Sequence, residues 1–494
     1  MSVTIVTLKS LLNNDLCSIK KKRDMKIEQI YTGCLAQGAY YITSNGEAAI
    51  IDPLREIQPY LERLKKDNVK LKYIFETHFH ADFVSGHVDL AKATGADIVF
   101  GPTADPEFDC IIGKDEQIFK IGDINIKLMH TPGHTMESST YLLVDKEGKD
   151  HAIFSGDTLF LGDVGRPDLA QKAANMTQDQ LAGHLYDSLM TKIMPLADDV
   201  IVYPAHGAGS ACGKNMMKET VDTLGNQKKV NYALNQPNKE AFVAAVTDGL
   251  LPPPAYFGAN VAMNKKGYKN VDEVIKTGLT ALSPKEFEVA AEGTGALIID
   301  TRNATDFHKG FIPNSVNIGI AGDFAPWVGA MIGDVQQPIL LVTDKDMEEE
   351  VIIRLSRVGF DNVIGFLKGG FETWKNEDRE IDKVNRITPA EFERLLKVGE
   401  SIVYDVRKES EYEAEHVDEA YSRPLASLNE WTKDINPEEH FFMHCAGGYR
   451  SMIAASILQS RGYRNFTEID GGMSQIATTK IPKTDYVCQS KIMK

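Results

Sequence analysis

The C-terminal part of the chain contains one module twice, and this repeat limits the possible folds more than any other feature. The run Leu297-Ile-Ile-Asp-Thr-Arg recurs as Ile402-Val-Tyr-Asp-Val-Arg, 105 positions later (402 minus 297). The run Ser283-Pro-Lys-Glu-Phe recurs at the same spacing as Thr388-Pro-Ala-Glu-Phe. Helical segments alternate with β-branched segments in both copies, which is typical of α/β domains with a parallel sheet. We therefore expect two tandem α/β domains over residues 283–494.

The length of the chain, 494 residues, predicts about three domains at roughly 150 residues each. The segment before the repeats contains Pro252-Pro253-Pro254 and few periodic patterns, which favours a linker or lid. At the N-terminus a charged cluster follows a broken apolar stretch, the reverse of a secretory signal, so we expect a flexible extension. The predicted parts are the extension 1–24, a first domain 25–236, the linker or lid 237–282, and the two repeats 283–384 and 385–494.

Composition excludes several classes of protein. Apolar residues make up 43% and charged residues 25%, as in globular proteins of aqueous compartments. The net charge of −16 argues against nucleic-acid binding, and no run of eighteen apolar residues predicts a membrane span. The six cysteines are sparse and form no CxxC pair, which favours a reducing cytoplasm over a disulfide scaffold or a zinc knuckle. They are Cys17, Cys34, Cys110, Cys212, Cys445 and Cys488.

Four strand-like runs in the first domain end in side chains that bind metals. One histidine after a strand would mean little, because most such histidines are structural. Four placements after buried strands, each with a Gly, Pro or Thr nearby, favour a metal site at one end of a sheet. The runs lead into His78, His80 and Asp82, into Thr131-Pro-Gly-His134, into Gly156-Asp157 and into Pro204-Ala-His206.

These motifs resemble those of the metallo-β-lactamase superfamily, whose signature THxHxD appears here as Thr77-His78-Phe79-His80-Ala81-Asp82. The resemblance covers about 210 residues and implies an αββα sandwich with a metal at one edge. Members with two metals, such as glyoxalase II, have a histidine directly after this aspartate. The chain has Phe83 there, which cannot bind a metal. A second metal would be left with Asp82, His206 and a shared Asp157, a poor zinc site, so we expect one metal.

Within the superfamily, the resemblance points to the persulfide dioxygenases, which use one iron. It implies one Fe(2+) per chain, held by His78, His134 and Asp157. Two imidazoles and one carboxylate with open positions form the ligand set of non-haem Fe(II) oxygenases. His80 and His206 would then orient the ligands or the bound oxygen, or would keep only a vestigial hydrogen bond.

Two further residues of the first domain have open roles. Arg166 matches an arginine in the family's GR-x-D segment; it either holds a substrate carboxylate or pairs with Asp168. Cys212 follows His206 in a glycine-rich segment that lacks the tyrosine of the glutathione-binding relatives, so the thiol carrier is open. Either Cys212 handles sulfur or it is structural.

A nucleophile is predicted in the second repeat only. The strand-like run Phe441-Phe-Met-His444 leads into Cys445-Ala-Gly-Gly-Tyr-Arg450, and an apolar helical pattern follows. A cysteine at a glycine-rich turn before a helix faces backbone N–H groups, which favour the thiolate. Arg450 can attract an anionic substrate.

This loop resembles that of the rhodanese sulfurtransferases. Its six residues fit a sulfur-accepting pocket, whereas related phosphatases have one residue more. In the first repeat the corresponding strand leads into Asp344, which we align with Cys445. An aspartate cannot carry sulfane sulfur, so we expect 283–384 to be a silent rhodanese-like domain that packs or spaces its neighbours.

Together the resemblances imply a fused persulfide dioxygenase and sulfurtransferase of sulfide detoxification. The first site would convert a low-molecular-weight thiol persulfide, such as glutathione persulfide, with O2 to sulfite. Cys445 would transfer sulfane sulfur to sulfite, giving thiosulfate, or would feed persulfide to the iron. The alternatives are a glyoxalase II-like thioester hydrolase with a sulfur-carrier module, and a non-catalytic sulfur carrier. A homo-oligomer is expected from the family.

Overall fold

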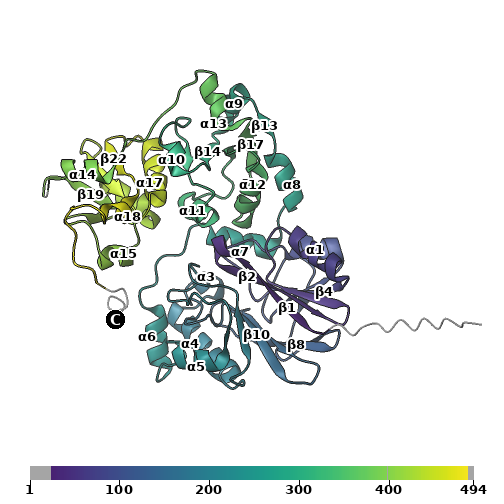
Figure 1. The fold of residues 1–494 in the computed structure, drawn as a ribbon. Helices are drawn as coiled ribbons and strands as arrows, with labels where there is room; N and C mark the ends of the chain where they lie inside the picture. The colour runs from purple at the N-terminus through teal and green to yellow at the C-terminus, as the bar shows by residue number, and fades with distance from the viewer. Residues whose placement is uncertain (1–23, 398, 488–494) are drawn as a thin grey trace, which may run out of the picture.

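The computed structural model describes residues 24–397 and 399–487 (Figure 1). Except for Asp24, the predicted N-terminal extension lies outside the described residues, as do Cys17 and Cys488. Among the described residues, no helix is both long and apolar enough to cross a membrane.

The first domain is built on two six-stranded mixed sheets. The strand orders are β1-β2-β3-β4-β5-β6 and β12-β11-β10-β9-β8-β7. The first sheet comprises β1 (Lys26–Thr32), β2 (Gln37–Ser44), β3 (Glu47–Ile51), β4 (Lys70–Phe75), β5 (Asp97–Phe100) and β6 (Ile111–Ile112). The second comprises β7 (Ile118–Ile121), β8 (Ile124–His130), β9 (Ser139–Val144), β10 (Asp150–Gly156), β11 (Ile201–Pro204) and β12 (Asp222–Thr223).

Helices cover the outer faces of both sheets. Side chains of the two inner faces, among them Phe75 and Phe154, form one core between the sheets. A second core joins the first sheet to α1 and α2, and a third joins the second sheet to α4 and α5. The predicted αββα sandwich is thus confirmed. Its helical segments are η1 (Gly33–Leu35), α1 (Gln58–Asp67), α2 (His87–Thr94), α3 (Gln171–Ala174), α4 (Gln178–Ser188), η2 (Leu189–Ile193) and α5 (Leu224–Val230).

The segment 237–282, predicted as a linker or lid with few periodic patterns, is largely helical. It forms α6 (Lys239–Thr247), α7 (Phe257–Lys266) and α8 (Val271–Gly278). Phe242 of α6 packs in the core under the second sheet, and Val274 of α8 packs in the core that continues into the first repeat. α6 buries only two apolar side chains, Phe242 and Val246, and α7 only Phe257, so the apolar period of these two helices is weak in the sequence.

The two repeats have the same sheet, as predicted. The orders are β13-β17-β16-β14-β15 and β18-β22-β21-β19-β20, and every pairing is parallel. The first copy comprises β13 (Ala281–Leu282), α9 (Pro284–Thr294), β14 (Leu297–Asp300), α10 (Ala304–Phe307), β15 (Val316–Asn317), α11 (Phe324–Met331), β16 (Ile339–Val342), α12 (Glu348–Arg357), β17 (Val363–Leu367) and α13 (Gly370–Asn376). The second comprises β18 (Arg386–Ile387), α14 (Pro389–Leu395), β19 (Ile402–Asp405), α15 (Glu409–Ala414), β20 (Tyr421–Ser422), η3 (Leu425–Ser427), α16 (Leu428–Trp431), η4 (Thr432–Asp434), β21 (Phe441–His444), α17 (Tyr449–Ser460), β22 (Phe466–Ile469) and α18 (Gly472–Ile476).

The strand register corrects one sequence alignment between the copies. Asp300 pairs with Val342 in the first copy, and Asp405 pairs with His444 in the second. The residue after each strand is therefore Thr343 in the first copy and Cys445 in the second. Alignment of Asp344 with Cys445 was wrong by one residue, because the strand pairing places Thr343, and not Asp344, at the position of Cys445. A threonine hydroxyl cannot carry sulfane sulfur either, so the prediction of a silent copy is unaffected.

The first rhodanese-like copy touches both of its neighbours. Val84 N–H in the first domain donates to the Arg357 carbonyl at the end of α12 (2.7 Å), and buried Arg55 pairs with Asp361 (2.8 Å). On the other side, the hydroxyl of Tyr449 in the second copy donates to the Gly319 carbonyl (2.8 Å). The first copy therefore fixes the position of both outer domains.

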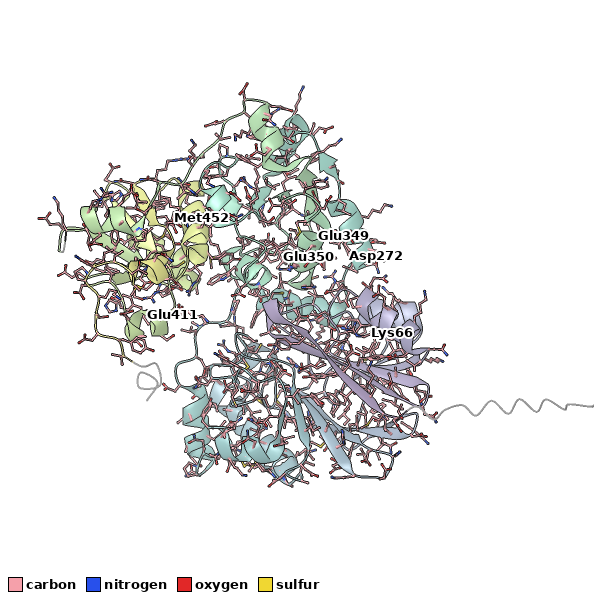
Figure 2. The ribbon with its side chains drawn as sticks, viewed as in Figure 1. Lys66, Asp272, Glu349, Glu350, Glu411 and Met452 are labelled. Carbon is pink, nitrogen blue, oxygen red and sulfur yellow. The ribbon has the colours of Figure 1, made fainter. Side chains whose placement is uncertain are left out.

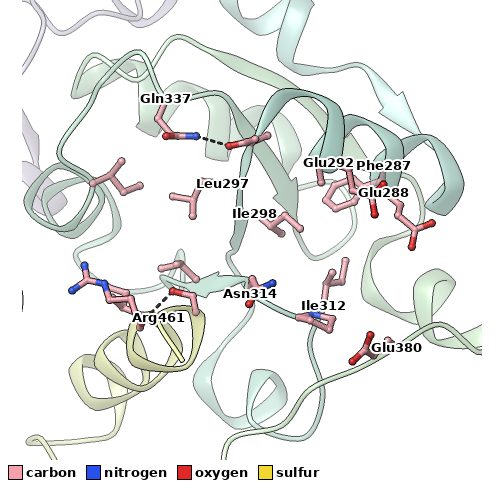
Figure 3. A pocket seen from close by; sticks show the side chains of 18 of the residues that line it. Phe287, Glu288, Glu292, Leu297, Ile298, Ile312, Asn314, Gln337, Glu380 and Arg461 are labelled. Carbon is pink, nitrogen blue, oxygen red and sulfur yellow. Dashed lines mark hydrogen bonds between the residues drawn. The ribbon is translucent and has the colours of Figure 1, made fainter. Parts of the chain in front are cut away.

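A cavity of about 680 Å³ lies between the two copies. Figure 3 shows Ile298 and Ile312 of the first copy on one side and Arg461, just after α17, on the other. The copies thus meet through α17 and β15 without filling all the space between them.

Candidate functional site

Three side chains predicted as metal ligands converge at one edge of the sandwich. His134 Nε2 lies 3.4 Å and His78 Nε2 lies 3.9 Å from Asp157 Oδ2. All three side chains are buried. The strands β8 and β10 run parallel in the second sheet, separated by antiparallel β9, so the residues after their C-terminal ends meet at one edge. Their spacing suits three ligands of one ion, each group offering one atom within 4.8 Å of the others.

The two histidines are oriented by hydrogen bonds at their other ring nitrogens. His134 Nδ1 lies 2.8 Å from the Arg166 carbonyl, and His78 Nδ1 lies 3.0 Å from Thr77 Oγ1. Thr77 in turn donates to Asp52 through both its N–H and its hydroxyl. Each Nε2 is left facing Asp157, as in metal sites where outer hydrogen bonds fix the ligand tautomer. Sequence patterns missed Asp52, although an aspartate directly after the apolar strand β3 could have signalled it.

The donor set fits a metal ion. Both carboxylate oxygens of Asp157 are buried without a hydrogen-bond partner among the described residues, an arrangement that costs free energy unless a cation is present. Burial lowers the pKa of His78 well below its usual value, which keeps its imidazole neutral and able to bind a metal. Gly156 (φ 53°) brings Asp157 close to this histidine, because a Cβ at Gly156 would lie 2.6 Å from Thr77 Cβ.

Two other predicted residues lie beside this centre. His206 Nε2 lies 3.6 Å from Asp157 Oδ1 and 3.4 Å from Asp82 Oδ2, while His80 Nε2 lies 3.1 Å from Asp52 Oδ1. His80, Asp82 and His206 form a second group whose ligand atoms lie close enough for an ion. Phe83 is fully buried and its ring packs against His80, with centroids 4.3 Å apart.

Arg166 is fully occupied by the protein. Its guanidinium forms a bidentate pair with Asp168 (2.6 and 2.7 Å) and also donates to the carbonyls of Ala211 and Leu251. Of its two predicted roles, this geometry favours the pairing with Asp168 over binding of a substrate carboxylate.

Cys212 lies beside His206 and Asp157, as one of the groups that could bind an ion. Both backbone groups of Cys212 are bonded within the protein. Its N–H donates to Ser210 Oγ (3.1 Å), and its carbonyl accepts from Arg166 N–H (3.0 Å). Burial raises the pKa of the Cys212 thiol to about 12, which keeps it neutral near pH 7.

The second predicted site surrounds Cys445 at the end of β21. Gly448 N–H donates to Cys445 Sγ (3.1 Å), and the Ser451 hydroxyl lies 3.4 Å from the same sulfur. Gly448 precedes α17 with a left-handed φ of 96°, which turns its N–H toward the sulfur. A neutral donor and the start of a helix both stabilise a thiolate.

Arg450, in the first turn of α17, forms a bidentate pair with Glu411 of α15 (2.6 and 2.9 Å). Glu411 is labelled in Figure 2. The pair is partly exposed. Arg450 can therefore release Glu411 to meet an anion at the mouth of the loop. Sequence patterns missed Glu411, Ser451 and the buried Glu468 beneath them; a serine directly after Arg450 was the available signal.

Comparisons with known proteins match both parts of the chain. The model of the metallo-beta-lactamase superfamily matches residues 32–206, and that of the rhodanese-like domain matches residues 283–377 and 388–479. A hydroxyacylglutathione hydrolase of Tolumonas auensis is 34% identical over 34% of this chain and 60% of its own length. The chain thus spans less than two thirds of that relative.

Two further relatives extend this result. Human persulfide dioxygenase ETHE1, mitochondrial, is 29% identical over 44% of this chain and 79% of its own length. The crystal structure of a metallo-beta-lactamase from Staphylococcus aureus subsp. aureus COL has a TM-score of 0.62 and 29% identity, and covers 70% of this chain and 99% of that chain. The chain thus consists of a metallo-β-lactamase domain followed by two rhodanese-like domains.

Proposed function

We propose that the chain oxidises a low-molecular-weight thiol persulfide with O2 and water to the parent thiol and sulfite, and transfers sulfane sulfur through Cys445. Sulfite accepts this sulfur and leaves as thiosulfate. The observation that carries the proposal is the presence, in one chain, of a buried two-histidine, one-carboxylate centre and a cysteine held by Gly448 N–H at the start of a helix.

In the first reaction, His78, His134 and Asp157 would hold a single iron, which supplies the redox chemistry with O2 when bound. Hydrogen bonds from the imidazoles to the Arg166 carbonyl and to the Thr77 hydroxyl oxygen keep His134 and His78 in position. His206 lies against Asp157 and can orient that carboxylate. Buried apolar side chains such as Phe83 and Phe160 exclude water from this edge of the sandwich.

In the second reaction, the Cys445 thiolate attacks the outer sulfur of an anionic donor. Arg450 attracts the donor, and Gly448 N–H stabilises negative charge on the cysteine sulfur. The two reactions suit one chain, because the product of the first, sulfite, is the acceptor of the second.

Thioester hydrolysis is the second candidate. Two observations favour it: several relatives are hydroxyacylglutathione hydrolases, and His80, Asp82 and His206 form a second set of possible ligands. Such a hydrolase would need two metals, whereas Phe83 supplies no ligand for the second.

Metal content and oxygen uptake separate the two functions. Protein purified without oxygen is analysed for metals and then given glutathione persulfide, other thiol persulfides or a glutathione thioester. The proposal expects one iron per chain and O2 uptake with a persulfide. Two zinc ions with thioester hydrolysis and no O2 uptake would overturn it.

One variant tests whether the two sites work separately. Asp157→Ala should lose iron and O2 uptake, because a ligand is removed, but should keep sulfur transfer from thiosulfate to cyanide. Loss of sulfur transfer in this variant, with the fold intact by circular dichroism, would contradict the assignment of transfer to Cys445.

A further inference from the structure

We propose that Glu468 accepts the thiol proton of Cys445 through the Ser451 hydroxyl and returns it when the sulfur is released. Ser451 touches the reacting sulfur, and Glu468 is a positioning residue that acts through it. The role of this proton relay in sulfur transfer rests on the proposed function, whereas the relay itself does not.

The three groups lie in a row beneath the loop. The Ser451 hydroxyl lies 3.4 Å from Cys445 Sγ and 2.6 Å from Glu468 Oε1. A serine hydroxyl has one proton to donate and can accept another. With the thiol protonated, the S–H faces Ser451 and the hydroxyl donates to the carboxylate. With the proton on Glu468, the carboxyl donates to Ser451 and the hydroxyl donates to the thiolate. The same heavy-atom positions serve both states.

Glu468 is suited to hold a proton near neutral pH. It lies on β22, fully buried, and burial raises its pKa to about 7 against the opposing effect of Arg386. The charged and titratable groups that face it are Arg386 of β18, whose Nε lies 2.6 Å from Oε2, Asp470 two residues further on, and Cys445 through Ser451. Asp470 pairs with the other side of Arg386 (2.9 Å).

The first copy has none of the three residues of this proton relay. In the same register, Arg386 pairs with Glu468 in the second copy, and Ala281 pairs with Phe366 in the first. A buried carboxylate costs free energy that an apolar pair at the same position avoids. The charged pair therefore occurs where the cysteine occurs, and an apolar pair occurs where it is absent.

The proton balance closes over one turnover. Cys445 gives its proton through Ser451 to the Glu468 carboxylate, and the resulting thiolate attacks the outer sulfur of a thiol persulfide. One S–S bond forms, the donor's S–S bond breaks, and the parent thiolate leaves with the electron pair. When an acceptor such as sulfite attacks the outer sulfur of the Cys445 persulfide, that S–S bond breaks and the cysteine leaves as a thiolate. Glu468 then returns the proton through Ser451.

The test is the pH profile of Cys445 alkylation by iodoacetamide in the full-length protein, reduced beforehand and quantified on the Cys445 peptide by mass spectrometry. It needs no persulfide, O2 or metal, so its result is independent of the proposed function. A cysteine and a carboxyl that share a proton titrate in two steps. We expect two steps in the natural chain, the first near the pKa of Glu468, and a single step in Glu468→Gln, which has no proton to exchange.

Ser451→Ala is the second variant, in case Glu468→Gln does not fold. Without the hydroxyl, alkylation within the first step should slow about tenfold, because the thiolate loses a hydrogen bond. Ser456→Ala is the control: this serine lies on the same helix, equally buried, but contacts Asn317 N–H instead of the sulfur. It should leave both steps intact. A single step in the natural chain, two unchanged steps in Glu468→Gln, or equal profiles of Ser451→Ala and Ser456→Ala would overturn the proposal.

Discussion

The two rhodanese-like copies have the same sheet but different residues after its central strand. Their five strands agree in order, and their Asp-x-Arg pairs have the same geometry: Arg302 contacts Asp300 as Arg407 contacts Asp405. The first copy even keeps a cavity of about 380 Å³ around the end of β16. The difference lies in the loop after that strand and in one pair of buried residues. The same fold thus carries different residues at this position in the two copies.

The silent copy differs from its partner in a second respect, because it contacts both other domains. It meets the metallo-β-lactamase domain at Val84, next to the metal-site motif, and the cysteine loop at Tyr449. The copy without a cysteine after its central strand is therefore the one that contacts both other domains.

Substitution of the residue that directly follows β21 or β16 is expected to have the largest effect. Cys445→Ser should lower thiosulfate-to-cyanide sulfur transfer by about 10³-fold or more, because a hydroxyl does not form a persulfide. Adding Thr343→Cys should not restore it, since that loop has Met347 where the active copy has Arg450, twelve positions before Gly359 and Gly462 respectively. Thiocyanate formation measures the rate. Recovery of activity in the double variant would show that the copies differ only in the nucleophile.

Glu468 should make the stability of the second copy depend on pH. Its pKa is raised in the folded protein to about 7. Between about pH 4.5 and 7 the folded state therefore holds a proton that the unfolded chain releases, and stability falls as the pH rises, by about 3 kcal/mol across this window. Glu468→Gln should lack this fall. Hydrogen exchange of β22 at several pH values measures the difference; equal pH dependence in both proteins would contradict it.

Replacement of Arg450 by the methionine of the silent copy should weaken binding of anionic donors. Arg450→Met is expected to lower kcat/KM for thiosulfate about 10- to 100-fold, because a charge-assisted contact is lost. Steady-state kinetics checks this, with Lys433→Met on the surface as a control. Unchanged kcat/KM would place the anion elsewhere in the loop.

The smallest effect is expected at the contact between the copies. Tyr449→Phe removes the hydrogen bond to Gly319 and should cost about 1 kcal/mol of stability. Thermal unfolding measures it. A melting temperature of the variant equal to that of the natural protein would mean that packing of the tyrosine ring alone holds the copies together.

Most of the fold could be predicted because its signals are local. Repeats 105 positions apart predicted two α/β domains. Ligand-type residues after buried strands predicted where His78, His134 and Asp157 lie in the sandwich. The alignment of Asp344 with Cys445 was wrong because strand pairing, which sets the register, is not visible in one sequence.

The residues that sequence analysis missed act across long distances in the chain. Asn264 of α7 donates to the carbonyls of His80 and Phe83 (both 2.8 Å), almost two hundred positions earlier, and so holds the metal-site loop. Glu468 reaches Cys445 only because β22 lies beside β21. Neither contact has a spacing that a motif could reveal.

The most direct test of the two-site account is the product of persulfide oxidation by Cys445→Ser. The natural chain, given glutathione persulfide and O2, should release thiosulfate. The variant should consume O2 at the natural rate but release sulfite alone, because no cysteine persulfide is present to donate sulfur. Thiosulfate released at the natural rate by the variant would contradict the account.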